Sequence, residues 1–196
     1  ASGERYRLPI SKDGRMTVAP GPAETWMVVF NREKGGEQWK SLPIYDPEDC
    51  NVLLPEGWNL SLTHKVLGWT KTSVMDSLVD LKDTEEWRNF AGDVTYSTTV
   101  DLPSAGMPSY IDLGKVADIC SLKVNGRDCG VKWYGRRIYD ISGLLHEGSN
   151  TLEITVTTLL GNYVQTLKEN PVAQRFMFRR NNPLIPAGLI GPVVLY

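Results

Sequence analysis

The stretch "SLKVNGRDCGVKWYGRRIYDISGLLHEGSNTLEITV", residues 121–156, indicates a strand, a tight turn, a second strand, an aromatic and basic loop, and a further strand. Asn125-Gly126 is its strongest hairpin signal, because a type I′ turn needs positive φ at both central residues. A hairpin about this turn pairs Cys120 with Val131. The residues expected on its core face are Cys120, Leu122, Val124, Cys129 and Val131.

Runs of alternating apolar and polar residues recur along the chain, separated by clusters of glycine and proline. Besides the hairpin strands they lie at 25–30, 57–62, 93–102, 110–113, 151–159 and 191–196. In "DVTYSTTVDL", residues 93–102, apolar and polar side chains fall on opposite sides, as in a half-buried strand. Only 76–89 has spacing that suits a helix, and a short one. The pattern predicts an all-β fold, an antiparallel β-sandwich with jelly-roll topology.

The chain divides near residue 45. Its 196 residues fit one β-domain with an extra segment. Residues 31–49 are polar and carry glycine and proline, which is typical of a linker or long loop. We therefore expect strands that lie outside the sandwich, followed by a linker, over residues 1–45, and the sandwich itself over 46–196.

Charge and hydropathy limit the partners. Twenty-one basic and 23 acidic residues give a net charge of -2, so neither nucleic acid nor an acidic membrane surface is expected as a partner. No stretch has the ~18 apolar residues of a membrane span, and the first residues lack the apolar region of a signal peptide. A start at Ala1 without Met predicts a mature chain or a piece of a longer one.

Three cysteines are too few for a disulfide scaffold. Cys120 and Cys129 would lie diagonally across the hairpin at roughly 7 Å between Cα atoms, at the limit for an unstrained disulfide. We therefore expect free buried thiols, with a metal or redox pair as the weaker reading because there is no C-x-x-C spacing. No cofactor is predicted. A structural calcium ion stays open, because oxygen-rich loops such as "DPEDCN", residues 46–51, can hold one without a readable motif.

Side chains arranged for catalysis are scarce in the sequence. His64 and His146 are the only histidines, and neither has a local partner, so we expect His64 on a strand face and His146 in a solvated turn. No nucleophile elbow, zinc-binding helix motif or phosphate-binding glycine loop occurs. Glycosidases need two facing carboxylates, and the acidic residues between 46 and 86 lie in polar segments with nothing to bring two into a pocket. We predict no catalytic residue.

Aromatic residues remain: six Trp and eight Tyr. An aromatic face can cover the apolar face of a sugar while polar groups meet its hydroxyls. The loop "WYGRR", residues 133–137, combines both types. We expect Trp133 and Tyr139 to anchor the loop in the core while Tyr134, Arg136 and Arg137 project toward a ligand or neighbour. Paired guanidiniums suit an acidic sugar or an acidic protein patch. Alternatively the arginines pair with carboxylates of the same chain.

Four segments in order carry a family resemblance: "NFAGDVTYSTTVDLP", "YIDLGKVADICSLKVNGRDCGVKW", "YDISGLLHEGSNTLEITV" and "PAGLIGPVVLY". Residues 55–196 resemble the galactose-binding-like jelly-roll domain of glycoside hydrolases. They are most similar to the C-terminal β-sandwich of family 106 α-L-rhamnosidases and more distantly similar to the sugar-binding domain of family 2 β-galactosidases. The earlier "GRMTVAPGPAETWMVVF", residues 14–30, is similar to the strand pair that closes the preceding β-domain in such enzymes.

The resemblance implies a non-catalytic carbohydrate-binding or accessory module of a glycoside hydrolase, secreted or periplasmic. Its partners would be carbohydrate, the catalytic domain, or both. It implies three rim loops near the ligand, at 90–93, 133–137 and 161–163. The ligand-binding residues carried over are Trp133, Tyr134, Arg136, Arg137, Asp93, Asn162 and Tyr163. "YGRR" and "LLGNYV" depart from the family's usual proline-rich and Asn-Arg segments, which weakens the sugar role. The alternative is a purely structural β-sandwich that contacts a neighbouring domain or protein without sugar.

Overall fold

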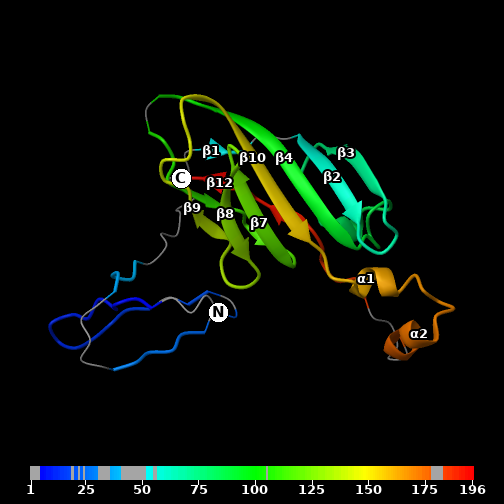
Figure 1. Cartoon of the computed structure of the whole chain (residues 1–196), viewed down its shortest axis with the longest axis horizontal. Helices are drawn as coiled ribbons and strands as arrows, with labels where there is room; N and C mark the ends of the chain where they lie inside the picture. The colour runs from blue at the N-terminus through cyan, green and yellow to red at the C-terminus, as the bar shows by residue number, and fades with distance from the viewer. Residues whose placement is uncertain are drawn as a thin grey trace.

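The computed structural model describes residues 5–18, 20–21, 23, 25–30, 36–40, 52–54, 57–104, 106–177 and 183–196. Strands dominate it and pair antiparallel, as Figure 1 shows. The larger sheet has six strands in the order β3 (Thr70–Met75), β2 (Trp58–His64), β4 (Gly92–Leu102), β10 (Gly148–Thr157), β7 (Ile119–Val124) and β8 (Arg127–Lys132).

A smaller sheet covers one face of this larger one. Its order is β1 (Val52–Leu53), β12 (Val194–Leu195), β5 (Tyr110–Asp112) and β9 (Ile138–Asp140), and a two-stranded sheet joins β11 (Leu189–Gly191) to β6 (Lys115–Val116). The short helices α1 (Gly161–Val164) and α2 (Pro171–Met177) and a 3-10 turn, Leu81–Asp83, complete the structure. The antiparallel β-sandwich that the sequence predicts is confirmed.

The core lies between the two sheets and follows from the alternation along each strand. In β4 every second residue is buried, and Tyr96 at its centre has no exposed surface. The Tyr96 hydroxyl accepts a hydrogen bond of 3.2 Å from the backbone N–H of Leu189, which gives this N–H a partner in the core. Burial raises the pKa of Tyr96 far above its ordinary value. The core therefore joins β4 to β11 through a polar contact as well as through packing.

The predicted hairpin turn is present, with φ of 50° at Asn125 and 77° at Gly126. The Asn125 amide also donates to the Leu144 carbonyl (2.9 Å) and to Oδ1 of Asn150 (2.9 Å), while its Oδ1 accepts from the N–H of Thr151. The turn thus fixes the loop before β10 as well as its own hairpin.

The register beyond the turn differs from the predicted one because β8 carries a β-bulge. Lys123 pairs with Asp128, but Ser121 pairs with Val131 and Cys120 with Lys132. The extra residue is accommodated at Gly130, whose φ of 94° is unfavourable for residues with a Cβ. From Val131 onward the faces are exchanged, so Val131 is 63% exposed and not in the core.

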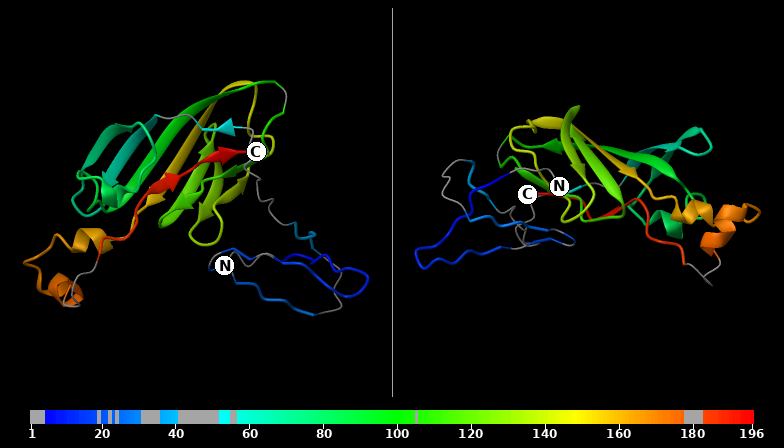
Figure 2. Two further views of the ribbon diagram at one scale, coloured as in Figure 1. Left: turned by 180° about the vertical axis from the view of Figure 1, so that it is seen from behind. Right: turned by 60° about the horizontal axis from the view of Figure 1, so that its bottom comes forward.

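Several other local predictions need correction. Residues 25–30 form no strand, and their side chains are largely exposed, because the described part of the chain offers them no partner strand. The segment 76–89 folds mostly as turns around the 3-10 helix. β3, α1 and α2 were not predicted. Figure 2 shows the helices at one end of the molecule and the N-terminal segment away from them. The described residues between 5 and 30 belong to no strand; an isolated bridge joins Arg7 to Gln38.

Candidate functional site: the rim of the six-stranded sheet

The three predicted rim loops do emerge at one edge of the larger sheet. β4 begins there at Gly92, opposite His64 of β2, and β10 ends there with Thr157 opposite Ile119 of β7. β8 ends at Lys132, opposite Cys120. Because adjacent strands are ~4.8 Å apart, the loop after β8 and the loop after β10 lie on the same rim but two strand spacings from each other.

Trp133 is the most exposed aromatic ring of this rim, at 60%. Its indole meets the Tyr134 ring edge-on, with the ring centroids 4.7 Å apart and an interplanar angle of 68°. The sequence predicted that Trp133 anchors the loop in the core; this is wrong, because the bulge at Gly130 turns Trp133 to the outer face. Arg136 is also exposed, so the loop presents one aromatic face and one guanidinium to solvent.

Arg137 lies at the base of the loop and not at its tip. Only 9% of it is exposed, and its two terminal nitrogens donate to the backbone carbonyls of Gly135 (2.8 Å) and Asp118 (3.2 Å). Its Nε is buried and has no hydrogen-bond partner among the described residues. The expected projection of Arg137 toward a ligand is therefore wrong: the side chain ties the loop to the start of β7. The alternative expectation, pairing with a carboxylate, is not realised either, because both acceptors are main-chain carbonyls.

Tyr139 anchors the loop, as predicted. It is 4% exposed, and its hydroxyl donates to the Cys120 carbonyl at 3.3 Å. The Cys120 thiol lies 3.5 Å from the same hydroxyl, and burial raises the pKa of this thiol. Cys120 and Cys129 are both free, as expected, but only Cys120 is buried, because Cys129 is half-buried; Cys50 lies outside the described residues.

Asp93 lies at the rim but is held by its neighbours. Lys65 contacts its carboxylate at 2.8 Å, and the Thr157 hydroxyl donates to it at 2.7 Å. Burial alone would raise the pKa of Asp93, but these two hydrogen bonds outweigh it and lower the pKa below its ordinary value. Asp93 therefore remains ionised and joins the ends of β2, β4 and β10.

Asn162 and Tyr163, in α1, contribute mainly to packing. Asn162 is 2% exposed; its amide donates to the Ile185 carbonyl at 2.8 Å and its Oδ1 accepts from the Ile185 N–H at 2.9 Å. The Tyr163 ring meets the buried ring of His64 edge-on, with centroids 5.0 Å apart. Phe90 and Trp69 contact His64 from other sides. α1 thus packs against the rim beside β2, through the contact of Tyr163 with His64.

His64 was not predicted to matter, yet it organises this aromatic cluster. It is 3% exposed, and its Nδ1 accepts hydrogen bonds from the backbone N–H groups of Val66 (3.3 Å) and Leu67 (3.2 Å). Desolvation lowers the pKa of His64, which keeps the ring neutral and able to accept. His146 is exposed in a turn, as expected.

Asp118, a further carboxylate at the rim, directly precedes β7 and has a φ of 74°. Its carboxylate accepts from the N–H of Leu159 at 3.3 Å, and burial raises its pKa. The Asp118 carbonyl also accepts a hydrogen bond from the Arg137 guanidinium. Asp118 therefore connects the loop after β8 to the loop after β10.

The N-terminal segment reaches the same loop. A Cβ placed on Gly21 would lie 3.0 Å from the backbone N of Arg136 and 3.3 Å from the Cα of Gly135. Gly21 therefore packs directly on the loop backbone, a contact that could not be predicted from the sequence. One side of the "WYGRR" loop is thus occupied by the chain itself.

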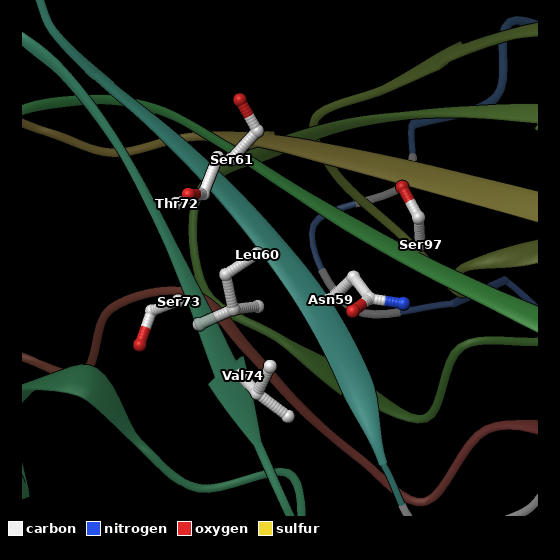
Figure 3. Close-up of a pocket in the computed structure, with 7 residues that line it drawn as sticks. All are labelled: Asn59, Leu60, Ser61, Thr72, Ser73, Val74 and Ser97. Carbon is white, nitrogen blue, oxygen red and sulfur yellow. The ribbon is translucent and has the colours of Figure 1, made fainter.

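A separate hollow of about 430 Å³ lies away from the rim, on the outer face of β2, β3 and β4 (Figure 3). The side chains on this face that border it are Asn59, Ser61, Thr72, Val74 and Ser97. None of them is charged. The alternation in "WNLSLTH" and "DVTYSTTVDL" predicts that Asn59, Ser61 and Ser97 face outward, but it does not predict the hollow.

Among the described residues, no three His, Cys, Asp or Glu side chains gather where they could hold a metal ion. The stretch 46–51, considered for calcium, lies outside the described residues. No helix in the described part of the chain is both long and apolar enough to cross a membrane.

Comparison with solved structures finds similarity to parts of glycoside hydrolases. The chain is similar to the rhamnosidase from Novosphingobium sp. PP1Y, with 25% identity and a TM-score of 0.62, over 84% of this chain and 16% of that one. Weaker likenesses are to β-glucuronidases from Ruminococcus gnavus (17%, TM-score 0.47, 60% of this chain and 22% of that one) and Dictyoglomus thermophilum (19%, 0.41, 54% and 19%). The resemblance to glycoside hydrolases is confirmed. No protein-family model and no curated protein matches the chain.

Proposed function

We propose that this chain is a non-catalytic carbohydrate-binding module of a glycoside hydrolase, with Trp133 as the sugar platform. The observation that carries the proposal is the exposed indole of Trp133, held edge-on by Tyr134 at the rim of a sandwich. Exposed aromatic faces of this kind stack on the apolar face of a pyranose. Arg136 beside it supplies hydrogen-bond donors and favours a sugar that carries a carboxylate.

The structural similarity supports an accessory role. The chain corresponds to 16% of the rhamnosidase chain, so most of such an enzyme lies outside the matched part. Two acids that could serve chemistry are engaged in the described structure: Asp80 is 8% exposed and bound by Lys82 at 3.0 Å, and Asp93 is bound by Lys65. We therefore propose that the chain by itself hydrolyses no glycoside. Turnover of aryl glycosides that survives repurification would contradict this.

A second candidate is a structural sandwich whose rim contacts a neighbouring domain. The packing of Gly21 on the backbone of Gly135 and Arg136 favours it, because a loop already covered on one side by another segment resembles an interdomain contact. In this case Trp133 would be buried against protein and not against sugar.

A glycan array on the chain, followed by calorimetry with each binder, separates the two candidates. The carbohydrate-binding candidate predicts glycan binding that Trp133→Ala weakens strongly. Val131→Ala is the matched control, because Val131 is 63% exposed near the end of β8 but has no aromatic ring. The second predicts no glycan binding, together with association of the chain with the catalytic domain of its enzyme.

A further inference from the structure

The outer face of the larger sheet carries a row of polar side chains that the rim does not use. Ser97 on β4 lies directly opposite Asn59 on β2 and opposite Glu153 on β10. Next along the same row, Lys123 of β7 lies opposite Glu153. Directly opposite residues on one sheet face bring their side chains within reach of a single small ligand.

The groups in this row differ from their neighbours in their hydrogen bonding. Two residues along the strands, the hydroxyls of Thr95 and Thr155 bind each other at 2.9 Å, and those of Thr63 and Thr70 approach to 3.4 Å. By contrast, the polar side chains that border the hollow on this outer face form no hydrogen bond or ion pair with any described residue; these are Asn59, Ser61, Thr72 and Ser97. The same holds for Glu153. Hydroxyls of this sheet face thus pair at Thr63–Thr70 and at Thr95–Thr155 but bind no described residue at the hollow.

The shape of the surface coincides with the free groups. The hollow of about 430 Å³ is bordered by Asn59 and Ser97 on one side and by Ser61 and Thr72 on another, as Figure 3 shows. Val74, 66% exposed, supplies an apolar patch at its margin. This volume lies within the range of small-ligand sites.

We propose that this hollow is a second ligand site, which takes one neutral monosaccharide unit. An amide and three hydroxyls can each donate and accept, which matches the alternating donors and acceptors of sugar hydroxyls. Val74 meets the C–H face of the ring. The uncharged border selects a neutral unit, and Glu153, whose charge Lys123 offsets across the row, accepts from a sugar hydroxyl at the edge. Without an aromatic platform the affinity is on the order of 1 mM for a single unit.

NMR titration of the full chain tests this site. D-galactose, D-glucose and L-rhamnose are added separately, with D-glucuronate as the charged comparison, while the backbone amide signals are followed. The proposal predicts saturable shifts for Asn59, Thr72 and Ser97 with at least one neutral sugar and weaker ones with glucuronate. The double variant Asn59→Ala/Ser97→Ala should weaken this binding about tenfold, because it removes two direct hydrogen-bonding groups.

Thr99→Ala is the matched control, because Thr99 lies two residues beyond Ser97 on the same face of β4 but outside the hollow. It should leave the titration unchanged. Shifts confined to residues 133–136 would support the rim site and overturn this one, whereas shifts confined to the hollow would support this one and count against the rim. No shift at the hollow with any sugar, or shifts that the double variant leaves unchanged, would also overturn the proposal.

Discussion

Arg137 and Arg136 are adjacent residues of the same type in opposite environments, and this contrast gives a sharp prediction. Arg137→Ala removes two hydrogen bonds from a charged donor, at 2.8 and 3.2 Å, and leaves the carbonyls of Gly135 and Asp118 without that partner. Hydrogen bonds to charged groups contribute ~1.5 to 3 kcal/mol each. Removing a buried cation whose Nε has no acceptor in the described part of the chain offsets part of this loss.

The expected net cost of Arg137→Ala is therefore about 1 to 3 kcal/mol of the free energy of unfolding. For a chain of this length that corresponds to a decrease in Tm of roughly 3 to 10 °C. Arg136→Ala, at an exposed position, should change the free energy of unfolding by less than about 0.5 kcal/mol. Arg137→Lys keeps the charge but loses the planar fork that spans two carbonyls, so it should fall between the two.

Urea unfolding followed by circular dichroism measures these differences. The midpoint should shift for Arg137→Ala while the slope stays constant, which would show that stability and not the unfolded state has changed. Equal midpoints for the two alanine variants would refute the reasoning, because Arg137 would then hold nothing in place. A larger loss for Arg136→Ala would place the structural arginine at the wrong position.

Four further predictions concern the core and the rim. Trp133→Ala should leave the midpoint of urea unfolding nearly unchanged, because the side chain is 60% exposed, yet reduce sugar affinity in calorimetry by roughly thirtyfold. Stability should fall as the pH drops below about 6.5, because unfolded His64 protonates at its ordinary pKa while burial lowers the pKa in the folded state; the fall levels off below that lowered pKa. His64→Asn should remove this fall in pH-dependent unfolding, whereas His146→Asn should keep it. Tyr96→Phe should lower the free energy of unfolding in urea by about 1 to 3 kcal/mol, because it leaves the backbone N–H of Leu189 without its acceptor. Tyr110→Phe is the control, because the Tyr110 hydroxyl has no hydrogen bond to a described residue. All three cysteines should titrate as free thiols after denaturation without reductant, and a titre of one would reveal a disulfide.

The sandwich could be predicted because its signals are local. Alternation in residues 93–102 fixes which side of β4 is buried, and the Asn125-Gly126 pair fixes a turn type. Residues 25–30 show the limit of this method. Their alternation is that of a strand, but a strand also needs a partner, and the described part of the chain gives them none.

The rim could be predicted only in outline, because one extra residue changes the face of every later side chain in a strand. The sequence around Gly130 does not distinguish a bulge from a regular pair, so Val131 and Trp133 were assigned to the wrong face. Arg137 was misplaced for a different reason: its acceptors are backbone carbonyls, which any residue could supply. Hydrogen bonds from a side chain to main-chain carbonyls leave no pattern in one sequence.

Isothermal titration calorimetry of the chain with the strongest binder from a glycan array tests the central claim most directly. The account predicts saturable binding by the wild-type chain, about thirtyfold weaker binding by Trp133→Ala, and unchanged binding by Val131→Ala. Absence of binding to every glycan, or binding that Trp133→Ala leaves intact, would contradict a carbohydrate-binding role for this rim.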